Sequence, residues 1–103
     1  MSEDEILQAV KAYLKITWTS ETNDKNLLGM IRRGKRKLID IAGAELEFKE
    51  DSLEMELLLD YCRYTNSQAL EMFETNFSSE LTSLHYNTQI MYVDIEEDAT
   101  NEN

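Results

Sequence analysis

Proline is absent from this sequence of 103 residues, and glycine occurs only at Gly29, Gly34 and Gly43. Strand-and-turn architectures use both residue types at their corners, whereas long stretches without them favour helices. The single cysteine, Cys62, cannot form a disulfide within the chain, so nothing indicates an oxidising compartment. No apolar run approaches the ~20 residues of a membrane span. The sequence therefore predicts a one-domain, all-α protein of a cytoplasm-like environment, with no membrane partner.

Side chains that could act as nucleophiles, bases or metal ligands in a defined site are equally scarce. His85 is the only histidine and Cys62 the only thiol. Neither a metal-finger spacing nor a glycine-rich phosphate loop is present. Since an enzyme needs a nucleophile, a base or a metal in a defined arrangement, we expect no catalytic residues, no cofactor and no metal site. His85 is expected to stabilise the C-terminal end of a helix, and Cys62 to be a buried small hydrophobe.

Apolar residues recur with helical spacing in four segments, which predicts a small bundle of about four helices. The first covers roughly 3–15 and begins with Ser2 and Glu5 at capping-box spacing. The second covers roughly 24–42 and carries Gly34 in its apolar stripe, where a close helix crossing would explain the glycine. Gly43 is placed to end this helix. In the connector before it, Trp18 is expected to pack over the core.

The third helix begins at Asp51 or Ser52 and reaches about residue 66, and the fourth follows a break near Ser67 and reaches about residue 84. The third helix is apolar on most sides, which argues for burial against another subunit. The candidate core or subunit-contact residues are Leu57, Tyr61, Tyr64, Phe73, Phe77 and Leu81.

The C-terminal region has a different character. Ile90–Ile95 is rich in β-forming residues and is expected to be a short extended segment that docks on the core or on a neighbour. Glu96–Asn103 is acidic and polar, which is typical of a disordered tail. The predicted division is a helical domain at 1–86, followed by the extended segment and tail at 87–103.

Charge is distributed very unevenly. The net charge is −11, yet five of the ten basic residues lie between Arg32 and Lys37. On a helix they would form one solvent-facing patch opposite the apolar stripe. Such a patch could balance acidic residues within or between subunits, contact nucleic-acid phosphates, or bind an acidic protein such as another copy's Glu96–Asp98. The candidate contact residues, for channel DNA or a partner, are Arg32, Arg33, Lys35, Arg36 and Lys37.

The nucleic-acid interpretation meets two difficulties. The net charge of −11 repels nucleic acid at long range, and no aromatic residue lies among the basic ones to stack on bases. A contact with a subunit or partner is therefore at least as well supported as a contact with DNA.

Several motifs recur in an order typical of one family. They are Asp24-x-x-Leu27-Leu28-x-x-Ile31, Leu38-Ile39-Asp40-Ile41-Ala42-Gly43, Leu57-Leu58-Leu59-Asp60-Tyr61-Cys62-Arg63-Tyr64-x-Asn66-Ser67, Ala69-Leu70-x-x-Phe73, and Asn76-Phe77-x-x-Glu80-Leu81-x-x-Leu84. This order resembles the small head–tail connector (adaptor) proteins of tailed phages and prophages, often described as DNA-packaging proteins. The resemblance covers roughly 3–86.

The resemblance implies a helical bundle that assembles as a homo-oligomeric ring, usually of about twelve subunits, beneath the phage portal protein. The ring would extend the channel through which phage DNA passes and give the tail or a stopper protein a surface to join. It implies a place in the virion at the head–tail junction, and in the host cytoplasm during assembly. The alternatives are a small DNA-binding regulator or packaging-initiation protein that uses the basic helix, and a host-directed inhibitor or DNA mimic that uses the acidic surface.

Overall fold

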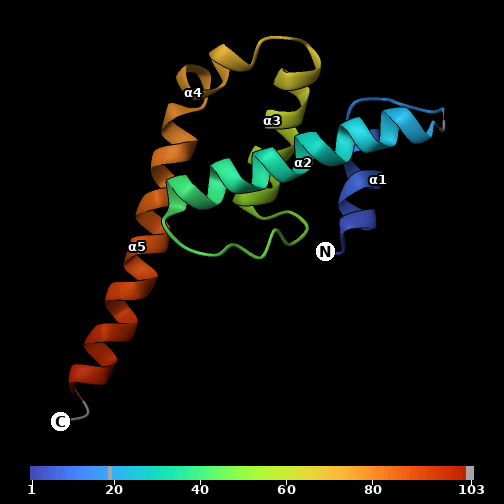
Figure 1. Ribbon diagram of the computed structural model, residues 1–103. Helices are drawn as coiled ribbons and strands as arrows, with labels where there is room; N and C mark the ends of the chain where they lie inside the picture. Colours follow the sequence, from blue (N-terminus) through green and yellow to red (C-terminus); the bar gives the residue numbers. More distant parts are fainter. Residues whose placement is uncertain (19, 102–103) are drawn as a thin grey trace.

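The computed structural model describes residues 1–18 and 20–101, with side chains as far as Ile90. The described residues contain five α-helices and one short 3-10 turn, and no strand (Figure 1). The predicted all-α class is therefore confirmed. The elements are α1 (Glu3–Tyr13), α2 (Glu21–Ala42), α3 (Leu53–Asn66), η1 (Leu70–Met72), α4 (Phe73–Asn76) and α5 (Ser78–Asn101).

Three helices begin at serine caps. Ser2 and Glu5 form the predicted capping box at α1, each side chain accepting the other residue's backbone N–H. Ser20 caps α2, which begins a few residues before the predicted start, and Ser52 caps α3 by accepting from Met55 N–H. α2 ends at Gly43 as predicted, in the left-handed conformation with φ 76° that glycine adopts without strain.

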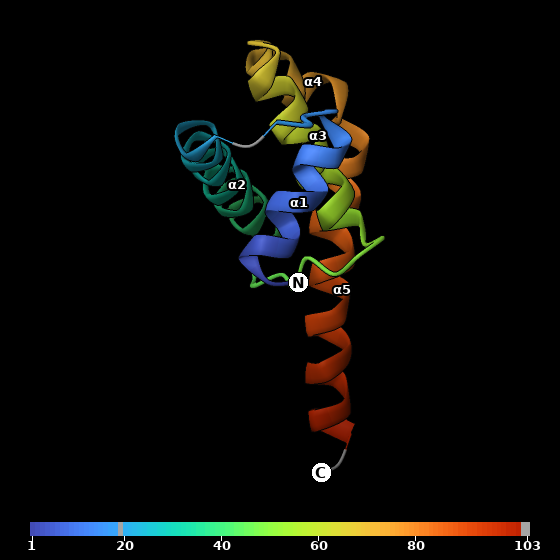
Figure 2. The same cartoon turned by 90° about the vertical axis from the view of Figure 1, so that its right-hand side faces the viewer.

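α3 is the central helix of the body. It packs against α1, α2, η1, α4 and α5, and Figure 2 shows α1, α2 and α5 grouped around it. Leu57, Leu58 and Cys62 on α3 are at most 2% exposed. The chain's own helices thus bury the apolar faces of α3, and the expectation that a second subunit must cover it is wrong.

Gly34 marks the crossing of α2 over α3. A Cβ atom on Gly34 would lie 2.7 Å from Cδ1 of Leu58 and 2.7 Å from Cδ1 of Tyr61. Since real Cβ atoms do not approach other heavy atoms so closely, only glycine permits this approach without a rearrangement. The predicted close crossing is confirmed. The crossing places Leu27, Ile31 and Leu38 of α2 in the core. The opposite side of α2 therefore faces outward.

The C-terminal third differs from its prediction. The expected single helix to about 84 is divided into η1, α4 and α5, with the last break at Phe77. The extended segment predicted at Ile90–Ile95 is wrong, because α5 continues through it to Asn101. The disorder predicted from Glu96 onward is likewise not found up to Asn101, and 102–103 lie outside the described residues.

The continuation of α5 has a physical reason. Leu81 and Leu84 anchor its first turns in the core, and adding residues to an existing helix is far easier than nucleating one. No proline follows to stop it. Local preference for β structure is weak beside this propagation. The predicted boundary between 86 and 87 therefore falls inside a continuous helix.

The molecule is elongated. Its Cα atoms extend over 58 × 29 × 18 Å. In both Figure 1 and Figure 2 the C-terminal part of α5 runs beyond every other helix. None of the helices in the described part of the chain is both long enough and apolar enough to cross a membrane.

Trp18 does not pack over the core as predicted. Its side chain is 59% exposed, while Leu14 and Ile16 of the same connector pack against the core instead. Those two smaller residues supply the connector's apolar contacts, so the indole is left at the surface.

Candidate functional site

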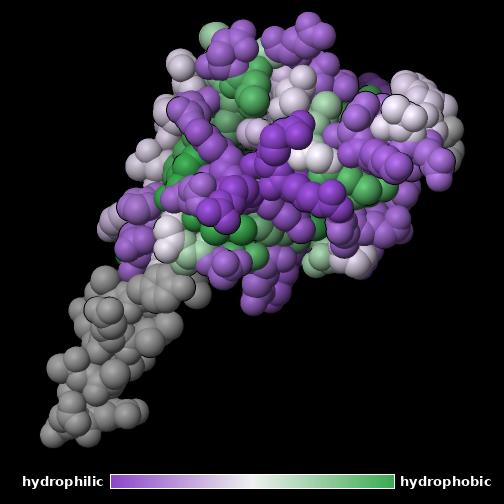
Figure 3. All heavy atoms as spheres, viewed as in Figure 1, coloured by the Kyte–Doolittle hydropathy of each residue, from purple (hydrophilic) through white to green (hydrophobic). Residues whose placement is uncertain are grey.

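The predicted basic residues do form one surface. We call Arg32, Arg33, Lys35, Arg36 and Lys37 the α2 basic face. The three arginines are exposed and the two lysines are half-buried. In Figure 3 hydrophilic residues form a band along α2, which crosses the middle of the view. The periodicity of α2 produces this surface, because residues on the opposite arc are held in the core.

Four of these five cations have partners within the chain. Arg32 Nη2 lies 2.6 Å from Glu3 Oε1, and Arg36 Nε lies 3.4 Å from Asp40 Oδ1. Lys37 forms an ion pair with Glu74. The Nζ of Lys35 lies 5.5 Å from the centre of the Phe48 ring, a cation–π distance.

Arg33 differs from its neighbours on the α2 basic face. Within the described residues it makes no ion pair. Pairing with nearby acidic residues therefore explains most of the α2 basic face. It does not explain Arg33.

The two arginine pairs are weak enough to exchange. The side chains of Arg32 and Glu3 are 66% and 50% exposed, and those of Arg36 and Asp40 are 80% and 62% exposed. Ion pairs between such exposed groups contribute about 0–1 kcal/mol, since water solvates both charges well. An incoming anion could therefore replace Glu3 or Asp40 at little expense, and the α2 basic face stays available to a partner.

The predicted core residues cluster around one aromatic group. Tyr61 and Phe73 meet edge to face with ring centres 5.5 Å apart, and Tyr64 and Phe77 do so at 5.4 Å. Phe73 and Phe77 stack at 5.2 Å. Leu57, Tyr61, Phe73 and Leu81 are buried, and Tyr64 and Phe77 pack against them half-buried. All six residues belong to the core of the single chain, and the four aromatic ones join α3 to α4 and to the start of α5.

A polar network between α1 and α3 was not predicted. The Tyr13 hydroxyl donates a hydrogen bond of 2.5 Å to Asp60 Oδ1. The same oxygen accepts from Arg63 Nε at 3.3 Å. Donation to the Asp60 carboxylate raises the pKa of the Tyr13 phenol, with partial burial adding to the effect. Because the two helices are far apart in sequence, periodicity alone gives no sign of this contact.

His85 has the predicted kind of role at a different helix. Its Nδ1 lies 2.9 Å from the carbonyl oxygen of Ile41, and Gln89 Nε2 donates to the carbonyl of Ala42 at 3.3 Å. Both carbonyls belong to the last turn of α2, where backbone acceptors lack helical partners. Two residues one turn apart on α5 thus cap the C-terminal end of α2, not of their own helix.

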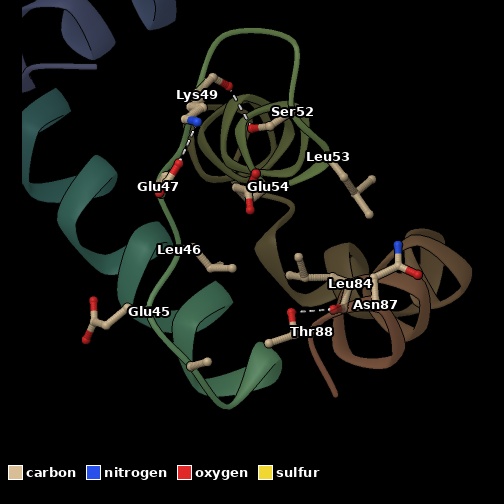
Figure 4. A pocket seen from close by; sticks show the side chains of 11 residues that line it. Glu45, Leu46, Glu47, Lys49, Ser52, Leu53, Glu54, Leu84, Asn87 and Thr88 are labelled. Atoms are coloured by element: carbon tan, nitrogen blue, oxygen red, sulfur yellow. Dashed lines mark hydrogen bonds and ion pairs between the residues drawn. The ribbon is translucent and has the colours of Figure 1, made fainter. Parts of the chain in front are cut away.

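A groove of about 480 Å³ lies between α5 on one side and the 44–52 link with the first residues of α3 on the other (Figure 4). Leu46 and Leu84 point toward one another across it. Carboxylates of Glu47 and Glu54 line it, and the Lys49 ammonium lies 2.9 Å from Glu47 Oε2. With its only lysine already paired, this groove does not suit an anionic ligand.

The remaining reactive group is Cys62, which is buried. Burial raises the pKa of its thiol to about 12, so it is almost entirely protonated at neutral pH. Among the residues whose side chains are described, no three or more His, Cys, Asp and Glu residues are grouped so as to hold a metal ion. Comparisons of the chain with family models, with curated proteins and with solved structures give no match.

Proposed function

We propose that this protein is a head–tail connector of a tailed phage or prophage. It assembles as a ring beneath the portal protein, extends the DNA channel and presents a surface to the tail or to a stopper protein. It catalyses no reaction. The proposal begins from the sequence resemblance over 3–86, whose most specific motifs supply α3, α4 and the buried residues of α5.

The observation that carries the proposal is the course of α5. Its C-terminal part leaves a body in which the central helix is already covered by the same chain. The anchored first turns explain why this part of α5 is helical, but they do not explain what it packs against. A helix that extends away from its own core is therefore better explained in a component of a larger assembly, where other molecules pack beside it.

The charge supports the same function. A net charge of −11 on a small chain repels DNA at long range, and a channel lined by such subunits lets DNA slide instead of binding it. The ring would lie at the head–tail junction of the virion and form in the host cytoplasm during assembly. The rival DNA-binding regulator would need the α2 basic face for phosphates, but the net charge of −11 repels a duplex and no aromatic residue lies between Arg32 and Lys37 to stack on bases.

The test is co-expression of the chain with the portal protein encoded near it, followed by affinity purification through a tag on the portal. We expect the chain to copurify in a complex of many copies, and a portal protein from an unrelated phage provides the control. A chain that ignores its portal at every concentration would contradict the proposal. Salt-titrated binding to duplex DNA tests the rival: micromolar affinity of the monomer, lost when Arg32, Arg33 and Arg36 are replaced by Glu, would support it.

A further inference from the structure

The segment of α5 that leaves the body is acidic. We call residues 90–101 the arm. The arm contains Asp94, Glu96, Glu97 and Asp98 and no basic residue, and no lysine or arginine occurs anywhere after Arg63. The α2 basic face holds half of the chain's cations. One helix thus carries half of the basic residues, and another carries an acidic segment that leaves the body.

The acidic positions of the arm and the arginines of the α2 basic face span the same length of helix. Asp94, Glu97 and Asp98 follow one another at i, i+3 and i+4, the spacing of neighbouring positions on a helix. Arg32, Arg33 and Arg36 also fall within little more than one turn. At about 1.5 Å of rise per residue, each set spans roughly 6 Å along its helix. Two helices laid beside each other could therefore bring the three carboxylates and the three guanidinium groups together.

The arm cannot make this contact within its own chain. α5 meets α2 at the C-terminal end of α2, where His85 contacts Ile41 and Gln89 contacts Ala42. From that point α5 runs away from the body in both views, whereas Arg32 and Arg33 lie near the middle of α2 (Figures 1 and 2). Only the arm of another molecule can reach the α2 basic face.

We propose that the arm of one copy docks on the α2 basic face of a second copy, with its carboxylates opposite Arg32, Arg33 and Arg36. Arg33, which forms no ion pair with any side chain up to Ile90, is the first cation available, and the weak exposed pairs of Arg32 and Arg36 exchange their acidic partners for the arm. The contact is head to tail, so every added copy offers a new arm and a new face, and a closing rotation gives a ring. The inference rests on the proposed function in one respect: the connector ring is the assembly that this contact would build.

A second copy fits the α2 basic face better than DNA does. A duplex presents uninterrupted negative charge to the whole molecule, whose net charge of −11 repels it. The arm brings only a few carboxylates, on a helix that runs away from its own body. Attraction is then local while most of the repelling charge stays at a distance, where salt screens it.

The test reverses the charges one side at a time in the full chain and measures self-association by sedimentation velocity over a concentration series. The face variant carries Arg32→Glu, Arg33→Glu and Arg36→Glu. The arm variant carries Asp94→Lys, Glu97→Lys and Asp98→Lys. A matched control carries Lys15→Glu, Lys25→Glu and Lys49→Glu, three exposed lysines elsewhere on the chain whose replacement changes the net charge by the same amount as the face variant. Far-UV circular dichroism verifies that each variant is folded.

We expect the face variant and the arm variant each to weaken self-association at least about tenfold, and the control to stay near the wild type. An equimolar mixture of the face and arm variants should associate again, because each then offers the other a complementary surface. The arm variant is decisive, since it lowers the net negative charge and would associate more strongly if overall repulsion alone governed the equilibrium.

Three results would overturn the docking proposal. They are a wild type that stays monomeric up to millimolar concentration, single variants that associate like the wild type, and a mixture that fails to recover. A face variant that loses duplex binding but keeps self-association would assign the α2 basic face to DNA instead. None of these results decides whether the chain binds its portal, so the connector function stands or falls separately on copurification.

Discussion

Replacing Gly34 by alanine tests the helix crossing on which the outward position of the α2 basic face depends. In an unobstructed helix interior this change stabilises a protein by roughly 1 kcal/mol, because alanine restricts the unfolded chain. Here the new methyl group would lie 2.7 Å from atoms of both Leu58 and Tyr61. Leu58 is fully buried and Tyr61 is 6% exposed, so neither moves without disturbing the core. Such overpacking costs typically about 1–3 kcal/mol.

The restriction of the unfolded chain stabilises the variant and the overpacking destabilises it, so their sum decides the sign of the change in unfolding free energy. We expect Gly34→Ala to lower the free energy of unfolding by about 0–2 kcal/mol. Gly29→Ala is the matched control on the same helix. Its Cβ would meet only Nη1 of Arg33, at 3.3 Å, and that flexible end can move away. Gly29→Ala should therefore stabilise the protein by up to about 1 kcal/mol.

The assay is urea and thermal unfolding of both variants beside the wild type, followed by far-UV circular dichroism. The difference of about 1–3 kcal/mol between the variants corresponds to at least about 4 °C in Tm for a domain of this size. If both variants were stabilised equally, α2 would not cross α3 at Gly34. The orientation that we give to the α2 basic face would then be unfounded.

Three further predictions concern the body. Cys62 should react with a disulfide reagent at pH 8 only as fast as the protein unfolds, because burial raises the pKa of its thiol to about 12; rapid reaction in native buffer would show that the site is open. Tyr13→Phe should lower the free energy of unfolding by about 0.5–1 kcal/mol by removing the hydrogen bond to Asp60. Since the pKa of Tyr13 is raised from 10.0, this contribution is fully present below pH 10 and is lost as the pH rises through the higher folded value, so wild type and variant should converge in alkali; a constant difference would contradict it. Phe73→Ala, which empties a site 1% exposed between three aromatic rings, should cost about 3–5 kcal/mol in chemical unfolding, and a loss below 1 kcal/mol would exclude Phe73 from the core.

Those parts of the fold that depend on local signals were predictable from sequence. Ser2 and Glu5 predict the start of α1, and Gly43 predicts the end of α2. The apolar stripe that contains Gly34 predicts both the close helix crossing and the outward position of the basic residues on α2. The C-terminal part was not predictable in this way. The β-forming residues of Ile90–Ile95 suggested an extended segment, whereas the anchored first turns of α5 carry the helix through them.

The candidate site was only partly predictable for a related reason. Periodicity places all five cations on one face, but it cannot say which of them have acidic partners. Glu3 and Glu74 reach the face from other elements, so their pairs with Arg32 and Lys37 exist only in three dimensions. The same limit applies to Trp18, whose exposure follows from the smaller Leu14 and Ile16 occupying the places at the core.

The most direct test of the proposed function is the position of the protein in phage particles. Particles released from a host that carries the gene would be purified and labelled with a gold-conjugated antibody against the chain, then imaged by electron microscopy before and after gentle separation of heads from tails. We predict label at the junction of head and tail, and no label on empty precursor heads that have not yet received DNA. If the chain is absent from finished particles, or is found on host proteins instead, it is not a connector.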